Sequence, residues 1–433
     1  MKSRFLGLWA SALIFLFGAC SINKKISKQA NALLIKDTAI RTGHIGISLF
    51  EPSSNTYWYN YNASHYFIPA SNTKLFSFYA GLKYLKDSLV AAHYDVMDDS
   101  VLVVEAMADP SFLQPAFSYQ PLFDLMKKYK RIELHFEPYR STPQYGYGWA
   151  WDDYEETYMP LPSQMPIYGN QLSIKKEGQS LQIQPSYFEK VVTVNDPTSK
   201  TGFQARRAFN SNTFWTYAGK NKVQEIPFIA DINTVVNLLQ DTLHTKVEWK
   251  ALNLWNGKYK NCYSQPTDTL LKDMMHRSDN FYAEQVLMMA SKLQLGSINA
   301  ENMRKYLLEN SLKDIPQKPS WVDGSGLSRY NLFTPMSIVY LLNKMKQEFS
   351  WDRITTILPT GGEGTIRNYY LKDSGYIFAK TGTLSNNCAL SGYLITKKGK
   401  LLIFSILANN YIGPAGPVRR AVEHFLEEIR TKY

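Results

Sequence analysis

A polar turn that leads directly into an apolar helix, at residues 67–85, constrains the fold more than any other stretch. Ser71 lies at the start of this predicted helix, and Lys74 follows three positions later on the same helix face. An amine in a partly desolvated pocket loses pKa and can accept a proton from a neighbouring hydroxyl. The free N–H groups at a helix N-terminus also favour an oxyanion. We therefore interpret Ser71 as a candidate nucleophile and Lys74 as its candidate base.

Two further motifs follow in order, Ser278-Asp-Asn280 and Lys380-Thr-Gly-Thr383. The first opens a predicted helix at residues 278–293, and the second follows a short predicted strand at residues 376–379. Each motif also has chance copies elsewhere in the chain. These copies are Ser21/Lys24, Ser173/Lys176, Ser53, Ser297, Ser385 and Lys200-Thr-Gly202. We select Ser278 and Lys380 because each adjoins the kind of element that such a motif needs.

Class A β-lactamases and penicillin-binding proteins share these three motifs, and the chemistry of each residue type supports the same assignment. Ser71 can attack a carbonyl carbon and form an acyl-enzyme. Ser278 can relay a proton to the leaving amine, and Asn280 can hold both the substrate amide and Lys74. Lys380 can bind a terminal carboxylate as a point charge and keep the other amine of the site from protonating.

The residues after Lys380 complete the predicted site. Thr381 and Thr383 offer hydroxyl contacts to the same carboxylate, and Gly382 lets the substrate backbone approach the strand edge. The backbone N–H groups of Ser71 and Thr383 form the predicted oxyanion hole. No motif calls for a metal or a cofactor, and the seven histidines show no Cys/His spacing typical of zinc sites.

Length and charge bound the class of protein. A chain of 433 residues is expected to form two or more domains. The net charge of +11 comes from basic residues that are spread along the chain, and no nucleic-acid-binding motif is visible, so a nucleic-acid partner is not predicted.

The N-terminal residues 1–20 have the pattern of a targeting segment. Lys2 and Arg4 precede an apolar run at residues 5–17, and Gly-Ala-Cys20 follows. This end resembles a bacterial lipobox, although Phe17 stands where leucine is usual. We predict a lipoprotein signal peptide, acylation of Cys20, a tether at residues 21–32, and a protein anchored to a membrane on the periplasmic side of the cell envelope. A plain signal peptide or an uncleaved anchor are the alternatives.

The pattern of elements predicts an α+β fold. Residues 44–50 and 56–61 form a predicted hairpin that leads to Ser71. Strand-like pieces and Pro- and Tyr-rich loops at residues 87–225 predict an inserted, mainly β domain. The remaining predicted elements are helices at residues 232–243, 300–311, 335–349 and 418–433 and a hairpin at residues 391–408. They assign residues 33–86 and 226–433 to a discontinuous catalytic domain, an antiparallel sheet flanked by helices.

The chain resembles the penicillin-binding D-alanyl-D-alanine carboxypeptidase/endopeptidase family of low-molecular-weight class C, serine peptidase family S13. Three stretches carry the resemblance beyond the motifs, at residues 148–153, 323–329 and 358–365. The gap from Ser71 to Ser278 is about twice that from Ser278 to Lys380, a long first gap that is typical of this group. Residues 104–110, Val-Glu-Ala-Met-Ala-Asp-Pro, depart from the glycine-rich run that the family often has there.

This resemblance implies a transpeptidase-like domain, an activity on peptidoglycan stem peptides, and β-lactam antibiotics as ligands. It also implies that Trp149 and Asp152 receive the free amine of the diamino acid in the stem peptide, with Leu384 at the same wall. Either removal of terminal D-Ala or cleavage of cross-links is compatible with the motifs, because the two reactions differ only in the leaving amine.

Other interpretations stay open from the sequence. The chain can be a β-lactamase or related serine esterase on the same fold, or a catalytically silent peptidoglycan-binding lipoprotein. An α/β-hydrolase is disfavoured because no Gly-x-Ser-x-Gly motif is present. Cys262 and Cys388 can pair in an oxidising compartment, but their positions do not decide it.

Overall fold

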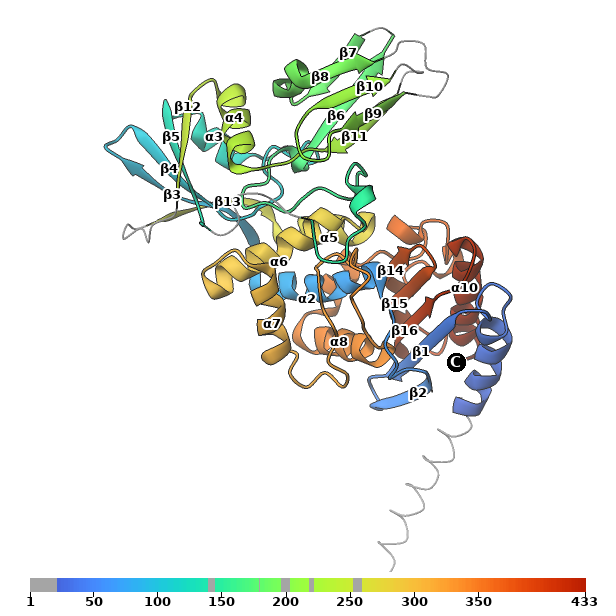
Figure 1. The fold of residues 1–433 in the computed structure, drawn as a ribbon. Helices are drawn as coiled ribbons and strands as arrows, with labels where there is room; N and C mark the ends of the chain where they lie inside the picture. The colour runs from blue at the N-terminus through green and yellow to red at the C-terminus, as the bar shows by residue number, and fades with distance from the viewer. Residues whose placement is uncertain (1–21, 139–144, 179, 196–202, 218–221, 252–258) are drawn as a thin grey trace, which may run out of the picture.

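A five-stranded antiparallel sheet forms the centre of the catalytic lobe in the computed structural model (Figure 1), which describes residues 22–138, 145–178, 180–195, 203–217, 222–251 and 259–433. The strand order is β14-β15-β16-β1-β2. The bounds are Ile377–Leu384 for β14, Asn387–Ile395 for β15, Leu401–Asn409 for β16, His44–Glu51 for β1 and Thr56–Tyr61 for β2. The two ends of the chain therefore meet in one sheet, because β1 pairs with β16. The predicted α+β fold is confirmed.

Helices cover both faces of this sheet because its strands alternate apolar residues between two cores. Ile403 and Leu407 pack with the helices that carry the active site, whereas Phe404 and Ile406 pack with the terminal helix on the other face. The helices that share the core of the first face are α2 (Lys74–Tyr84), α5 (Thr267–Arg277), α6 (Asn280–Leu295), α7 (Ala300–Glu309), α8 (Pro335–Glu348) and α9 (Trp351–Ile357). Helix α10 (Ala415–Lys432) lies on the second face.

The predicted tether at residues 21–32 is wrong for the part that the structure describes. Residues 22–30 are α-helical and continue into a π-helical turn, η1 (Asn31–Ile35). Ile26, Ala30 and Leu34 recur every fourth residue and are buried against the core that α10 shares. This apolar stripe, rather than the polar residues between its members, decides the structure.

The described residues of the inserted lobe form three sheets around a core of their own. The largest has the order β12-β5-β4-β3-β13, and the smaller ones are β11-β6-β7 and β8-β10-β9. The bounds of the large sheet are β3 (Ser88–Met97), β4 (Val101–Ala106), β5 (Arg131–Phe136), β12 (Lys246–Ala251) and β13 (Lys260–Pro266). The others are β6 (Gln171–Glu177), β7 (Ser180–Gln184), β8 (Val192–Asn195), β9 (Gln204–Arg207), β10 (Phe214–Tyr217) and β11 (Val223–Pro227), with helices α3 (Pro121–Met126) and α4 (Ile232–Leu243).

The predicted boundary between the inserted domain and the catalytic domain, at residue 226, disagrees with the observed strand pairing. Strand β12 pairs in parallel with β5, and β13 pairs with β3, so residues 246–251 and 260–266 extend the large sheet of the inserted lobe. The sequence between 226 and 266 contains helical and strand patterns that fit either lobe, and only the pairing partners assign it.

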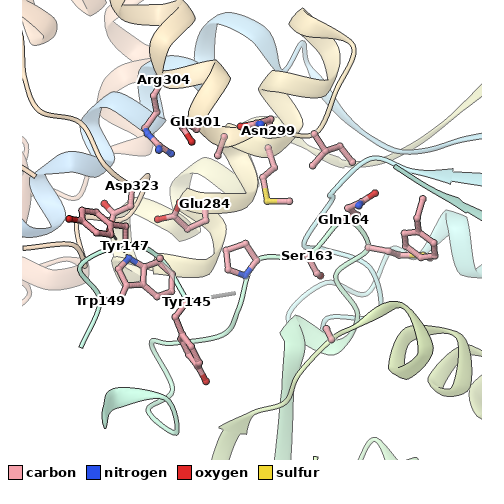
Figure 2. A pocket seen from close by; sticks show the side chains of 18 of the residues that line it. Tyr145, Tyr147, Trp149, Ser163, Gln164, Glu284, Asn299, Glu301, Arg304 and Asp323 are labelled. Atoms are coloured by element: carbon pink, nitrogen blue, oxygen red, sulfur yellow. Dashed lines mark hydrogen bonds between the residues drawn. The ribbon is translucent and has the colours of Figure 1, made fainter. Parts of the chain in front are cut away.

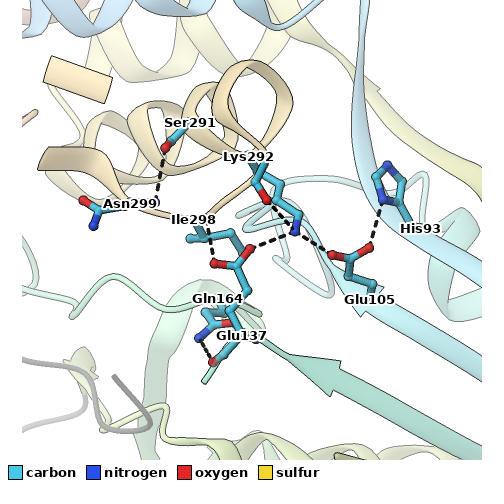
Figure 3. A network of polar contacts seen from close by, with 9 residues as sticks. His93, Glu105, Glu137, Gln164, Ser291, Lys292, Ile298 and Asn299 are labelled. Carbon is cyan, nitrogen blue, oxygen red and sulfur yellow. Dashed lines mark hydrogen bonds and ion pairs between the residues drawn. The ribbon is translucent and has the colours of Figure 1, made fainter. Parts of the chain in front are cut away.

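A buried ionic cluster joins the two lobes (Figure 3). Lys292 of α6 donates to Glu105 of β4 at 2.5 Å and to Glu137 at 2.8 Å. The second oxygen of Glu137 accepts from the backbone N–H of Ile298, and Glu105 also contacts His93. The helix that carries Asn280 at its start is therefore fixed to the inserted lobe near its end. No helix among the described residues is long and apolar enough to cross a membrane.

Candidate active site

The nucleophile turn is a short 3₁₀ helix, η2 (Ala70–Thr73), which continues directly into α2. Ala70 has a φ of 47°, a left-handed conformation that costs an alanine about 1 kcal/mol or more. Lys74 Nζ donates to Ser71 Oγ at 3.0 Å. The predicted pairing of Ser71 and Lys74 is thus present as a hydrogen bond before any substrate binds.

A second turn, between two helices, brings Ser278 and Asn280 to the same place. Ser278 ends α5 in a left-handed conformation with a φ of 58°, and Asp279 caps α6 by accepting from the N–H of Tyr282 at 2.9 Å. The predicted helix at residues 278–293 therefore begins at Asn280, because Ser278 is the left-handed residue that ends α5. Asn280 Oδ1 accepts from Lys74 Nζ at 2.6 Å.

Strand β14 supplies the third motif at the edge of the sheet. The predicted strand ended at residue 379, but β14 continues through Leu384, so the motif lies within the strand. Lys380 Nζ donates to Ser278 Oγ and to the backbone carbonyl of Thr381, both at 2.8 Å. A Cβ at Gly382 would lie 2.5 Å from the carbonyl of Pro69. The strand and the nucleophile turn therefore touch, which requires glycine at this position.

A loop at residues 323–328 completes the surroundings of Lys74. The carbonyl of Ser325 accepts from Lys74 Nζ at 2.7 Å. Glu284 of α6 fixes this loop because its two carboxylate oxygens accept from the N–H groups of Gly324 and Ser325, at 3.0 and 2.8 Å. Asp323 accepts from the N–H groups of Gly326 and Ser328 in the same loop and from the side-chain amide of Asn331. The loop is thus held in one conformation by two buried carboxylates.

The electrostatics of the site follow from burial. Desolvation lowers the pKa of the Lys74 ammonium to about 8, although Asp323, Asp279 and Glu284 oppose this change. Desolvation also lowers the pKa of Lys380 well below its usual range, and the positive charges of Lys74 and Arg419 add to the effect. Burial raises the pKa of Glu284. The site therefore holds two amines that lose protons more readily than free lysine.

A pocket of about 380 Å³ opens beside Ser71. Predicted residues that line it are Ser71, Ser278, Thr381 and Thr383. Further lining residues, which the sequence did not indicate as site residues, are Thr365, Arg367, Asn368, Tyr369 and Arg419. Lys74 and Lys380 do not line the pocket but hydrogen-bond Ser71 and Ser278, which do. Asn280 contacts Lys74.

Trp149, Asp152 and Leu384 are not among the residues that line this pocket. The indole N–H of Trp149 donates to Asp323 at 2.8 Å, so Trp149 supports the loop at residues 323–328. Asp152 lies on an exposed turn of the inserted lobe, η3 (Trp151–Asp153). Leu384 is the last residue of β14. A role for these three residues in holding a substrate amine stays a prediction.

A second cavity, of about 440 Å³, lies between the two lobes and shares Asp323 with the active-site loop. Figure 2 shows Glu284, Asp323 and Trp149 together at one side of this cavity, with Arg304 nearby. The two acids that hold the loop are therefore reachable from a side other than the nucleophile pocket. Cys262 and Cys388 are both free and buried, so they do not form a disulfide in the structure.

Sequence comparisons relate the chain to D-Ala-D-Ala peptidases. The model of the D-Ala-D-Ala carboxypeptidase 3 (S13) family matches residues 257–431. Carboxypeptidase DacB of Mycolicibacterium smegmatis is 29% identical over 180 residues, which cover 39% of this chain and 38% of the relative. A D-alanyl-D-alanine carboxypeptidase of an Actinomadura species is 41% identical over 101 residues, covering 22% of this chain and 19% of the relative. The matched segments thus span less than half of these two relatives.

The fold of the whole chain has a counterpart of known structure. Penicillin binding protein 4 from Haemophilus influenzae superposes with a TM-score of 0.73 at 20% identity, covering 94% of this chain and 99% of the other. The family match over residues 257–431 and the named relatives confirm the resemblance predicted above, and the structural match shows that the fold is shared.

Proposed function

We propose that this protein is a penicillin-binding serine D-alanyl-D-alanine carboxypeptidase/endopeptidase that acts on peptidoglycan stem peptides. The observation that carries the proposal is the continuous set of contacts around Ser71. Lys74 contacts both Ser71 and Asn280, and Lys380 contacts Ser278, while both serines line one pocket. The names of the relatives support the same class of reaction.

The acylation step follows from these contacts. Neutral Lys74 takes the proton of the Ser71 hydroxyl while the oxygen attacks the carbonyl carbon of the penultimate D-Ala. The N–H groups of Ser71 and Thr383 would stabilise the oxyanion. The C–N bond then breaks, and the leaving amine takes the hydroxyl proton of Ser278. The Lys380 ammonium, whose Nζ donates to Ser278 Oγ at 2.8 Å, replaces that proton and becomes neutral.

Water completes the cycle. It attacks the ester carbonyl of the acyl-enzyme, loses its proton to a neutral amine of the site, and returns the hydroxyl of Ser71. A β-lactam carbonyl would form the same ester but keep its leaving amine attached. That tethered amine can obstruct water, so we expect a long-lived adduct with penicillins.

The test is hydrolysis of a diacylated tripeptide that ends in D-Ala-D-Ala, followed by quantification of released D-Ala. The protein should release D-Ala, and Ser71→Ala should lower the rate by about a thousandfold or more. A cross-linked stem-peptide dimer in the same assay measures the endopeptidase reaction. No release from either substrate, or release that survives Ser71→Ala, would contradict the proposal.

We also propose that the protein is exported and anchored to a membrane by acylation of Cys20. The support is the sequence of residues 1–20, which lie outside the described residues. In a bacterial host, the full chain should partition with membranes, and Cys20→Ala should abolish metabolic labelling with palmitate. Equal labelling of the two chains would refute the anchor.

A further inference from the structure

The pocket beside Ser71 carries positive charge that the three motifs do not account for. Arg419 of α10 lines the pocket, and its Nη2 donates to Thr383 Oγ1 at 2.7 Å. Among the described residues, no carboxylate forms an ion pair with Arg419, whereas the next residue, Arg420, pairs with Glu423. Of these two adjacent arginines, Arg420 has its charge compensated by a carboxylate, whereas Arg419 presents an uncompensated charge to the pocket.

The surroundings of Arg419 keep this charge uncompensated. The side chain of Cys388 lies in the same small hollow as Arg419, and burial raises the pKa of its thiol although Arg419 opposes this change. Arg367, exposed at the rim of the pocket, adds a second positive side chain. A guanidinium keeps its proton at every pH at which a protein is folded. The pocket therefore attracts an anionic group.

Lys380 is poorly placed for that anion. The side chain is fully buried, does not line the pocket, and directs protons to Ser278 and to the carbonyl of Thr381. An ammonium has three protons, so at most one remains for a substrate. These contacts suit a group that orients the Ser278 hydroxyl, and they leave carboxylate binding to another cation.

We propose that Arg419 binds the α-carboxylate of the leaving amino acid, together with the hydroxyls of Thr381 and Thr383. The inference rests on the proposed function and assigns the cationic residue that recognises the free carboxylate of its substrate. Carboxylates bind a guanidinium through two parallel hydrogen bonds, which fix orientation as well as charge. The enzyme should therefore cleave peptides whose leaving amine stands next to a free carboxylate, and should cleave amidated leaving groups poorly.

Three substrates with one acyl group separate this role from others. The first is the acyl-D-Ala-D-Ala acid, the second is its C-terminal amide, and the third is the p-nitrophenyl ester of acyl-D-Ala, whose leaving group has no carboxylate. The native protein should prefer the acid over the amide by about tenfold or more, the range for a hydrogen bond to a charged group. Arg419→Gln should raise KM for the acid by about tenfold or more and remove this preference.

The ester and two further variants keep the test decisive. Arg419→Gln should lose much less activity on the ester than on the acid, which shows that the variant is folded and that Ser71 still reacts. Arg419→Lys should restore part of the preference as a point charge. Arg206→Gln, which removes an exposed arginine of the inserted lobe with 51% of its side chain accessible, should leave all three substrates unaffected.

Two outcomes would overturn the inference. An unchanged preference in Arg419→Gln would exclude carboxylate binding by Arg419. An equal loss on acid, amide and ester would assign Arg419 to the support of Thr383 alone. If the native protein cleaves none of the three substrates, the proposed function itself fails, and that result is distinct from either outcome.

Discussion

Lys74 and Lys380 are two buried amines that serve one site from opposite sides. Lys74 spans the gap between the Ser71 hydroxyl and Asn280, and Lys380 holds the hydroxyl of Ser278. Burial lowers the pKa of both. A base with a pKa near the working pH is effective because it is both available and able to accept a proton.

The pH dependence of acylation follows from Lys74. Since desolvation lowers its pKa to about 8, the neutral base gains population as the pH rises, and the acylation rate should increase about tenfold between pH 7 and pH 9. Stopped-flow measurement of penicillin acylation gives the profile. Lys74→Arg should lose about a hundredfold or more of the rate and the rise with pH. Lys83→Arg, on the exposed side of α2, serves as the control. A flat native profile would exclude Lys74 as the base.

The residues that the sequence could predict are those with a fixed local spacing. Ser71 and Lys74 lie on one helical turn, so their contact follows from the spacing alone. Arg419 could not be found this way, because it lies on α10, far from every motif, and reaches Thr383 only through the tertiary fold. A basic residue at the start of the terminal helix is by itself an unspecific signal.

At the scale of elements, three turns converge on the nucleophile, and close backbone packing holds them together. Gly326 has a φ of 87°, and a Cβ at this position would lie 2.0 Å from the carbonyl of Ala70. The loop at residues 323–328 is therefore in direct contact with Ala70, the residue before Ser71. Ala70 is itself in a left-handed conformation. This close backbone contact helps to hold Ser71 in place, and such positioning matters for the reaction rate.

Gly326→Ala should disrupt this packing. We expect a loss of about 2 kcal/mol or more in the free energy of unfolding, and a fall of about tenfold or more in the penicillin acylation rate. Gly399→Ala is the matched control, since Gly399 also has a positive φ, 75°, but has open space around it. Chemical denaturation and acylation kinetics of both variants provide the measurement. Equal effects at the two positions would show that φ strain, not contact with Ala70, matters.

Element prediction succeeded where the apolar pattern was strong and local. The β-hairpin of β15 and β16 and the helices α4 and α8 follow from their periodicity and their capping residues. The N-terminal helix was missed because its polar composition concealed a stripe of three apolar residues, Ile26, Ala30 and Leu34. Helix α5 was missed because charged residues interrupt its apolar pattern. The left-handed residue that follows it, Ser278, is also not the glycine that usually marks the end of a helix.

At the scale of the whole molecule, helix α6 connects the reaction centre to the inserted lobe. Its first residue is Asn280, and Lys292 three turns later forms the ionic cluster with Glu105 and Glu137. Burial opposes the charge of Lys292, but the hydrogen bonds that it donates to the two carboxylates raise its pKa overall. The partners in this cluster lie on β4 and a following loop, so sequence spacing could not pair them.

Removing one member of this cluster should leave buried charge uncompensated. Lys292→Met should cost about 3–5 kcal/mol in the free energy of unfolding at pH 7, measured by chemical denaturation. Burial opposes the ionisation of Glu105, but its hydrogen bonds with His93 and Lys292 lower the pKa of that carboxyl overall. The stabilisation that this carboxylate contributes is therefore present at neutral pH and is lost as the pH falls through the lowered value. The difference between native and variant should therefore shrink in acid.

The control for this change is Lys305→Met, which breaks an exposed ion pair with Glu301 on the surface of α7. Exposed pairs contribute at most about 1 kcal/mol, so this variant should be close to the native protein. A similar loss in both variants would mean that the interlobe cluster does not stabilise the fold beyond an ordinary surface pair.

The most direct measurement of the central claim is the intact mass of the protein after incubation with benzylpenicillin. The native chain should gain the mass of one penicillin, Ser71→Ala should gain none, and Ser173→Ala, at the chance copy of the motif in β6, should react like the native chain. A stable adduct that depends on Ser71 alone would establish the nucleophile of a slowly deacylating penicillin-binding protein. Rapid hydrolysis of the drug without an adduct would instead indicate a β-lactamase. The absence of both an adduct and hydrolysis would contradict the mechanism.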